Sequence, residues 1–576
     1  MTDLVLVNPR VVADKYPPLS LLSLAAYVRE RGHSVRLVDA QAEELSDVEV
    51  AKIVSVERPL LCGITFMTSQ VLDVKKLLGT LKSRCECKFV AGGVHTSVLP
   101  KEVKELGFDY CVVGEGEETL LELLCALKAG SEPTGIAGVW SDVDFVPRKL
   151  FEDINVLPMP AWDLAPVTLY KVSQPDARYV LESGRCLAVS TSRGCQYHCA
   201  FCASHSVFGK SHRERSPRSV VDEIETLCRH YGISKFFLVD ESILGNASRA
   251  EAFADEITKR RLKVMFASSA RVNDPGVNLT TLKKLKQAGM TRVDFGVESG
   301  SQRILNDIRK GITLEQIAMA HKIAHDAGLK TTSLMIVGHL EENWNDIVES
   351  LLLIDRIESD YPEFGPLTPF PDTEVYARAM REGWIRNEGE WDKFSISNWY
   401  RVLRNKNFDY QDILLLTYLC NGAVQVIRER TKLKDSWISF YHALTGRGDY
   451  PWAYLQIKGR FLVMKYLLTK DEKYLRELNF DHLTWRIRLI NDPHKYRLLS
   501  EVKRNPLSFF TSSQRVSTIR LAVSAVASAL RESIDSMIMC PIYAIASRSI
   551  SHHIDQKTPF INLQEKETEL GSPPDE

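Results

Sequence analysis

Three cysteines in one short stretch carry the plainest chemistry in this sequence. Cys195, Cys199 and Cys202 lie in STSRGCQYHCAFCAS with the spacing C-x-x-x-C-x-x-C, and Phe201 directly precedes the last of them. Cysteine thiolates are soft ligands that select zinc, copper(I) or iron–sulfur clusters. A [4Fe–4S] cluster normally takes one thiolate for each iron. Three cysteines therefore leave one iron open, and the spacing indicates a reactive cluster.

A zinc knuckle, or a set of buried free thiols, is the alternative for the same cysteines. Structural zinc usually takes four ligands, commonly from paired C-x-x-C units. His198 or His205 would have to supply the fourth ligand, because no second cysteine pair follows. We therefore favour the iron–sulfur cluster.

The pattern C-x-x-x-C-x-aromatic-C after the apolar segment 187–191 resembles the radical S-adenosylmethionine (SAM) enzymes. In that family the fourth iron chelates the amino and carboxylate groups of SAM. One electron from the cluster then splits SAM into methionine and a 5′-deoxyadenosyl radical. The resemblance implies that Cys195, Cys199 and Cys202 bind the cluster and that Phe201 lies beside the adenine.

Strands and helices alternate through the first 135 residues, which predicts a doubly wound, Rossmann-like parallel sheet. Apolar runs predict strands at 4–7, 34–38, 60–65, 87–91 and 109–113. Helical spacing predicts helices at 19–31, 69–83 and 117–128. The ligand of such a sheet lies at the carboxyl ends of the strands.

Glycine-rich loops follow two of these strands, Gly92-Gly93-Val-His-Thr and Gly114-Glu-Gly-Glu-Glu. Together with the segment 17–26 they resemble the cobalamin-binding domain that precedes many radical SAM domains. The resemblance implies cobalamin contacts at Thr65, Thr68, Ser69, Gly93, His95, Thr96, Gly114 and Glu115. The motif D-x-H-x-x-G, whose histidine binds cobalt in many cobalamin domains, is missing from the sequence. His95 is the alternative ligand, although a histidine in such a loop more often lies at the surface.

A second series of strands and helices occupies residues 186–375. Predicted strands at 187–191, 235–239, 264–268, 292–297, 331–337 and near 366–368 suggest a partial (β/α)6 barrel of the TIM type. Reactive residues of such barrels lie at the carboxyl ends of the strands. Polar residues at these ends, read through the family resemblance, give the SAM-binding candidates Asp240, Arg271, Glu298, Ser299 and Gly338.

The remaining segments separate these domains or follow them. Residues 136–185 are proline-rich and predict an interdomain linker anchored by Trp162. Residues 376–555 are predicted to form a mainly helical region that binds the substrate, with helices at 413–428, 452–468 and 516–530. Residues 556–576 are predicted to form a disordered tail. The aromatic residues of this region either line a substrate pocket or belong to its core: Trp399, Tyr400, Tyr418, Trp452 and Tyr454.

Composition and charge indicate which partners and which cellular compartment to expect. The formal net charge of −1 argues against nucleic acid as a partner. The scattered cysteines and the lack of a signal peptide or a long apolar run predict a reduced, cytoplasmic protein. Amphipathic helices near the C-terminus give weak support to peripheral membrane contact.

We expect an enzyme that cleaves SAM at a [4Fe–4S] cluster and uses cobalamin to methylate an unactivated carbon. The resemblance implies that methylcobalamin gives the methyl group to a substrate radical, and that a flavodoxin or ferredoxin supplies electrons. The substrate is a small or lipid-like molecule. One alternative is radical cyclisation, oxidation or C–C bond formation without methyl transfer, and another is a non-catalytic iron–sulfur scaffold or sensor. No residue stands out as a catalytic acid or base.

Overall fold

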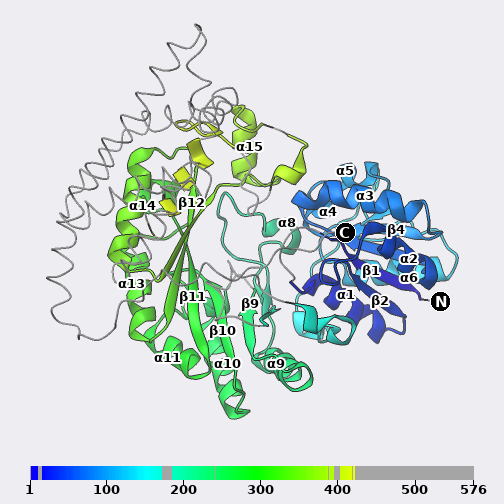
Figure 1. Ribbon diagram of the computed structural model, residues 1–576, viewed down its shortest axis with the longest axis horizontal. Coiled ribbons are helices and arrows are strands. Elements are labelled where there is room, and N and C mark those ends of the chain that lie inside the picture. The colour runs from blue at the N-terminus through cyan, green and yellow to red at the C-terminus, as the bar shows by residue number, and fades with distance from the viewer. Residues whose placement is uncertain are drawn as a thin grey trace, which may run out of the picture. The chain divides into compact units, whose positions relative to one another are not determined.

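The computed structural model describes most of the chain up to residue 410 (Figure 1). The described residues are 2–10, 16–170, 185–239, 242–386, 388–394, 402–410, 412–414, 416–417, 420–421 and 424. The predicted helices at 452–468 and 516–530 and the tail 556–576 lie outside these residues, as does most of the helix predicted at 413–428. The five aromatic residues singled out in the substrate region also lie outside them. Within the described part, no helix has the length and apolar character needed to cross a bilayer.

A five-stranded parallel sheet forms the centre of the N-terminal region. Its strands are β1 (Leu4–Asn8), β2 (Val35–Asp39), β3 (Leu61–Thr65), β4 (Lys88–Gly92) and β5 (Tyr110–Cys111), in the order β2-β1-β3-β4-β5. The apolar runs of β1 and β3 are buried, as expected for strands covered on both faces. The strand order reverses between β1 and β3, which is where doubly wound sheets bind their ligands. The predicted Rossmann-like fold is confirmed.

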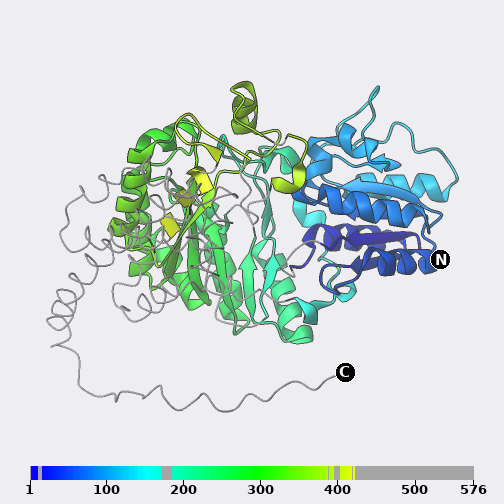
Figure 2. The same ribbon diagram turned by 45° about the horizontal axis from the view of Figure 1, so that its top comes forward.

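Helices cover both faces of this sheet (Figure 2). They are α1 (Leu19–Glu30), α2 (Asp47–Glu57), α3 (Val71–Lys82), α4 (Val94–Val98), α5 (Pro100–Glu105) and α6 (Glu117–Lys128). Helices α1 and α6 contact each other, and α2 contacts α3. Ser46 and Glu49 form a capping box that starts α2. The short helices α4 and α5, which follow the Gly92-Gly93 loop, were not predicted because neither is long enough to show a helical period.

The linker contains short 3-10 turns, η2 (Ile154–Val156), η3 (Trp162–Leu164) and η4 (Val167–Leu169). Trp162 is buried, and its Nε1 donates to Glu223 at 2.8 Å. The linker also contacts the N-terminal sheet, where the Tyr170 hydroxyl donates to Asp39 at the end of β2 at 2.8 Å. The linker is therefore packed against both regions that it joins, with Trp162 as the anchor the sequence indicates.

The second sheet has six parallel strands. They are β6 (Leu187–Val189), β9 (Lys235–Leu238), β10 (Met265–Ala270), β11 (Met290–Glu298), β12 (Lys330–Val337) and β13 (Tyr361–Pro366), in the order β13-β12-β11-β10-β9-β6. Consecutive strands lie side by side, as in a TIM-type barrel that stays open between its first and last strands. The predicted partial (β/α)6 barrel is confirmed.

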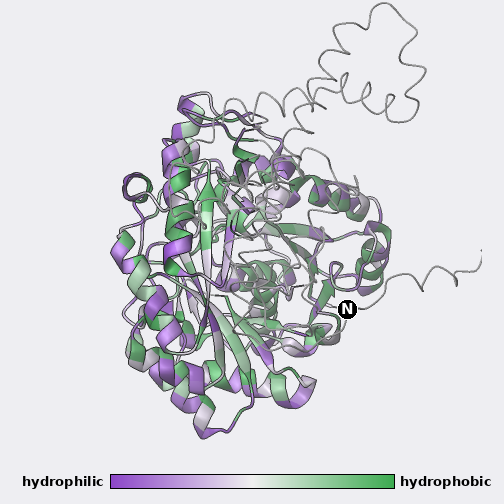
Figure 3. Ribbon diagram, turned by 60° about the vertical axis from the view of Figure 1, so that its left-hand side comes forward, coloured by the Kyte–Doolittle hydropathy of each residue, from purple (hydrophilic) through white to green (hydrophobic). Residues whose placement is uncertain are grey.

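The helices between these strands lie outside the sheet (Figure 1). They are α9 (Pro217–Tyr231), α10 (Ala247–Lys259), α11 (Leu279–Gln287), α12 (Gln302–Asp307), α13 (Leu314–Asp326), α14 (Trp344–Ile357) and, after the last strand, α15 (Glu374–Arg381). Ser216 caps α9 and Gly232 ends it in the left-handed conformation. Figure 3 shows that apolar and polar residues alternate along the helices.

Two features of the barrel differ from prediction. The last strand begins at Tyr361, so the expectation of a strand near 366–368 was too late in the sequence. Pro362 argues against a strand in the sequence, but β13 is an edge strand, where a missing N–H is tolerated. Helices α10 and α14 were not predicted, although Asn246 caps α10 and Asn343 caps α14.

Candidate functional site

The three motif cysteines border one cavity of about 180 Å³ at the barrel. Cys195, Cys199 and Cys202 are each partly exposed. Their loop starts and ends in a two-stranded antiparallel ribbon, β7 (Ser192–Arg193) with β8 (Arg213–Glu214), and contains the short helix α8 (His205–Phe208). In the described part of the chain no three His, Cys, Asp or Glu side chains converge on a point that would hold a single metal ion. All three cysteines line this cavity, and three soft donors on one cavity fit a multinuclear cluster.

Three of the predicted SAM-binding residues lie on the same cavity as the cysteines. Arg271 follows β10 and Glu298 ends β11, so both come from carboxyl ends of barrel strands. Phe201 also lines this cavity. Glu298 has a φ of 68°, a left-handed conformation that a residue with a side chain seldom adopts. Such outliers cluster at ligand sites, where the surrounding structure holds them in place.

Arg271 is directed at the cysteine loop. Its Nη1 lies 3.3 Å from the Cys199 Sγ, and its guanidinium stacks 3.7 Å from the centre of the Tyr197 ring. Its Nη2 donates to the Lys310 carbonyl. The Asp274 carboxylate accepts the backbone N–H of Arg271 at 2.8 Å. Arg271 therefore joins the end of β10 to the cysteine loop.

Lys310 is a site residue that the sequence did not reveal. It is buried, and its Nζ lies 2.7 Å from the Glu298 Oε1. The ammonium also lies 5.9 Å from the centre of the Phe201 ring. An ion pair between a buried lysine and a buried glutamate therefore forms one wall of the cysteine cavity. Only the short run Arg309-Lys310-Gly311 marks this position, and nothing in that run shows that the lysine is buried.

Ser299 and Gly338 are SAM-binding candidates that do not line this cavity. Ser299 is buried and its hydroxyl accepts the Ser301 N–H at 3.2 Å. The Gly338 N–H donates to the buried Glu342 at 2.6 Å, and a side chain at position 338 would meet Ile413. Burial raises the pKa of Glu342 to about 8. Asp240 lies outside the described residues.

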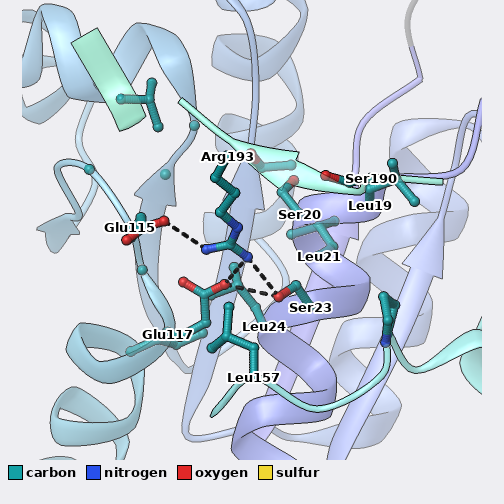
Figure 4. A pocket seen from close by; sticks show the side chains of 18 of the residues that line it. Leu19, Ser20, Leu21, Ser23, Leu24, Glu115, Glu117, Leu157, Ser190 and Arg193 are labelled. Atoms are coloured by element: carbon teal, nitrogen blue, oxygen red, sulfur yellow. Dashed lines mark hydrogen bonds and ion pairs between the residues drawn. The ribbon is translucent and has the colours of Figure 1, made fainter. Parts of the chain in front are cut away.

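A second, larger cavity of about 330 Å³ lies at the carboxyl edge of the N-terminal sheet (Figure 4). Its wall includes Gly63 of β3, the end of β4 and the start of α1. Among the predicted cobalamin contacts, Thr65, Gly93, Gly114 and Glu115 line it. A side chain at Gly63 would come 2.9 Å from Leu6, and one at Gly93 would come 2.7 Å from the Phe66 carbonyl. The cavity lies at the reversal of strand order, where the fold predicts a ligand.

The other predicted cobalamin contacts lie elsewhere. His95 is fully buried, so the expectation that it lies at the surface was wrong. Its Nδ1 lies 3.4 Å from the Thr68 hydroxyl, and its ring lies 5.8 Å from that of Trp391. Burial lowers the pKa of His95 to about 4. The Thr96 hydroxyl donates to the Gly92 carbonyl at 3.1 Å, and Ser69 is half-buried in the turn before α3.

Glu115 binds two arginines of the ribbon below the cysteine loop. Its Oε1 lies 2.9 Å from Arg193 Nη1, and its Oε2 lies 2.8 Å from Arg213 Nη1. Arg193 also binds Glu117 at 2.6 Å and the Ser23 hydroxyl at 3.0 Å (Figure 4). The wall of the larger cavity is therefore joined to the loop that carries the cysteines.

Two family models match the chain. The model of the radical SAM superfamily matches residues 189–354, and that of the B12 binding domain matches residues 6–124. An uncharacterized methyltransferase of Pyrococcus horikoshii is 32% identical over 440 residues, which cover 75% of this chain and 89% of that protein. The anaerobic magnesium-protoporphyrin IX monomethyl ester cyclase of Rubrivivax gelatinosus is 28% identical over 378 residues, or 63% of this chain and 66% of the cyclase.

Solved structures share the fold. The radical SAM methyltransferase TsrM of Kitasatospora setae, with cobalamin and a [4Fe–4S] cluster bound, superposes with a TM-score of 0.56 at 20% identity, over 66% of this chain and 75% of TsrM. The cobalamin-dependent enzyme OxsB, with aqua-cobalamin bound, gives a TM-score of 0.63 at 18% identity, over 89% of this chain and 82% of OxsB. The chain therefore belongs to the radical SAM enzymes with a cobalamin-binding domain, whose cofactors are a [4Fe–4S] cluster, SAM and cobalamin.

Proposed function

We propose that this enzyme cleaves SAM at a cluster held by Cys195, Cys199 and Cys202 and methylates a carbon atom of a small molecule. One observation carries the proposal: the three cysteines share a single cavity with Arg271 and the Glu298–Lys310 ion pair. Soft thiolates and a pair of opposite charges in one cavity suit a cluster together with a zwitterionic ligand. Similarity to a methyltransferase over most of its length supports methyl transfer as the outcome.

The charged pair suits the methionyl part of SAM, which offers an amino group and a carboxylate. In our proposal Glu298 accepts an N–H of the amino group and Lys310 donates to the carboxylate. Charge-assisted hydrogen bonds of this kind are stronger than neutral ones. Phe201 offers the adenine an aromatic face in the same cavity.

The N-terminal cavity suits part of cobalamin. Its wall is mostly made of apolar side chains and glycines, and the glycines let a ligand approach the backbone closely. His95 does not line it, so we propose that cobalamin binds without a histidine from this loop. Thr65, Gly93, Gly114 and Glu115 remain the proposed lining residues. Bound cobalamin would supply a methyl group that a carbon radical can accept. Its remethylation by SAM would need one electron from an external donor and would release S-adenosylhomocysteine.

The protein's own residues hold and orient these groups. Arg271 fixes the cysteine loop through Cys199 and Tyr197 and keeps a positive charge near the cluster. The reaction also needs an external one-electron donor, and a flavodoxin or ferredoxin has the chemistry required. We further propose that residues 376–555 select the substrate. The substrate that we propose is a small molecule, which includes lipid-like molecules.

The cyclase similarity supports a second candidate, radical chemistry without methyl transfer. Nucleoside analysis separates the two. The protein is reconstituted anaerobically with iron, sulfide and cobalamin, and then given SAM and a strong reductant. Methyl transfer predicts S-adenosylhomocysteine that depends on added cobalamin. If 5′-deoxyadenosine forms without S-adenosylhomocysteine in the presence of candidate substrates, methyl transfer is excluded and the second candidate is favoured. If a protein with an intact cluster does not cleave SAM in the presence of candidate substrates, the alternative of a scaffold or sensor is favoured.

A further inference from the structure

Two arginines lie opposite each other at the base of the cysteine loop. Arg193 and Arg213 are direct partners in the antiparallel ribbon formed by β7 and β8. Like charges at directly opposed positions destabilise a strand pair. Both side chains are largely removed from solvent, with 16% and 6% of their surface exposed. A buried pair of this kind needs a negative group between its members.

Glu115 is that negative group, and it comes from a different domain. The residue lies in the loop between β5 and α6, and each of its carboxylate oxygens binds one arginine, at 2.9 and 2.8 Å. Glu117, in the first turn of α6, binds Arg193 at 2.6 Å. The four side chains carry two positive and two negative charges, so the buried cluster is neutral.

Further hydrogen bonds hold the cluster in place. The Ser23 hydroxyl donates to Glu117 at 2.9 Å and accepts from Arg193 at 3.0 Å. The linker adds a further contact, because the Phe151 N–H donates to Glu115 at 3.1 Å and its carbonyl accepts from Arg213 at 2.9 Å. Burial by itself would raise the pKa of Glu115, but the hydrogen bonds from Arg213 and Arg193 outweigh burial and lower it. The carboxylate therefore stays ionised.

The backbone between this cluster and the first cysteine is short and has little room to move. Gly194 is the only residue between Arg193 and Cys195, and a side chain there would come 2.2 Å from the Ser211 carbonyl. His212 lies 2.9 Å from the Gly194 carbonyl through its Nδ1. A shift of the Arg193 side chain would therefore be passed to the position of Cys195.

We propose that Arg193 and Glu115 are positioning residues, which fix the cysteine loop of the barrel at a set distance from the ligand edge of the N-terminal sheet. Glu115 thus lines the cavity of the cobalamin-binding domain and also binds the ribbon of the barrel. The consequence for catalysis rests on the proposed function, because two cofactors must act on one substrate carbon.

The first test is hydrogen–deuterium exchange on the full-length protein loaded with cluster and cobalamin. Glu115→Gln and Arg193→Lys should each raise amide exchange in residues 192–215 by at least about tenfold while α9 keeps its wild-type protection. Asp294→Asn is the matched control, because it breaks an equally buried arginine pair with Arg292 inside β11. That control should leave residues 192–215 unchanged. If Glu115→Gln misfolds, Arg193→Lys, which keeps the charge, decides the outcome. Wild-type exchange in 192–215 in Arg193→Lys would overturn the proposal.

The second test separates positioning from general stability. Arg193→Lys should raise the ratio of 5′-deoxyadenosine to S-adenosylhomocysteine by roughly fivefold, because a misplaced loop still cleaves SAM but no longer couples it to methyl transfer. An equal loss of both products would contradict a positioning role. If the wild-type protein forms no S-adenosylhomocysteine, the proposed methyl transfer is wrong, whereas the exchange result still decides whether the two residues fix the loop.

Discussion

The Lys310 ammonium lies 2.7 Å from the Glu298 carboxylate, and both groups face the cavity that the three cysteines border. Burying two charges is costly unless they are paired. Here each side chain has about a tenth of its surface exposed or less, 6% for Lys310 and 10% for Glu298. The ion pair is buried, it lines a cavity, and its glutamate has a positive φ. These features are typical of groups that bind a charged ligand.

We predict that Lys310→Met weakens SAM binding by about 10- to 100-fold, the loss expected for one charge-assisted hydrogen bond to the SAM carboxylate. Isothermal titration of SAM into the reconstituted protein measures the effect. Lys322→Met is the control, because Lys322 forms an exposed pair with Asp326 on α13. Unchanged affinity in Lys310→Met would remove Lys310 from the SAM site.

The three cysteines should differ from the other thiols in their effect on iron. Replacing Cys195, Cys199 or Cys202 by alanine should abolish stable cluster assembly, since each supplies one of only three protein ligands. Cys228→Ala, on α9, should keep the wild-type iron content. Iron analysis and electron paramagnetic resonance of the reduced protein measure the difference. An intact cluster in any of the three alanine variants would mean that another residue serves as ligand.

Two adjacent glycines should respond very differently to alanine. Gly93 has a φ of 96° and no room for a side chain, whereas nothing lies within 4 Å of a side chain at Gly92. Gly93→Ala should therefore lower the free energy of unfolding by about 1–3 kcal/mol. Gly92→Ala should change it by no more than about 0.5 kcal/mol. Urea unfolding of the two variants gives the comparison, and equal stabilities would show that the strand-end geometry is wrong.

Glu342 makes stability depend on pH. Burial raises the pKa of its carboxyl from 4.5 to about 8 in the folded protein. Between these two values the folded protein keeps a proton that the unfolded chain has lost, so stability falls as the pH rises through this window. Glu342→Gln keeps an acceptor for the Gly338 N–H but cannot ionise. The variant should match the wild type near pH 5 and exceed its denaturation midpoint near pH 8.

Glu341→Gln serves as the control for this pH series. Glu341 is a neighbouring carboxylate that pairs with Arg378 and with Lys406 at the surface. Its replacement should not create an advantage that grows with pH. A constant difference between Glu342→Gln and the wild type across the series would show that Glu342 does not hold a proton.

Patterns confined to a short stretch were readable from the sequence. The spacing of Cys195, Cys199 and Cys202 indicates an iron–sulfur cluster. Apolar runs that end in glycine or polar residues predicted the positions of most strands. Arg271 and Glu298 were predicted from polar residues at strand ends, read through the family resemblance, and both line the cysteine cavity. Each of these features depends on residues that are close together in the sequence.

Features that depend on contacts between distant segments could not be read in this way. Lys310 looks like a surface lysine until the packed barrel buries it against Glu298. Glu115 looks like a loop residue near a ligand, and only the pairing of β7 with β8 shows that it lies between two arginines. His95 lies in a glycine-rich loop that suggests exposure, yet Trp391, nearly three hundred residues later, packs against it.

Reductive cleavage of SAM at the cysteine cavity is the central claim, and nucleoside analysis by mass spectrometry tests it most directly. The reconstituted protein is given SAM and a strong reductant under anaerobic conditions. We predict 5′-deoxyadenosine from the wild-type protein and none above background from Cys199→Ala. Equal amounts from both proteins, or none from a wild-type protein with an intact cluster and candidate substrates present, would contradict the account.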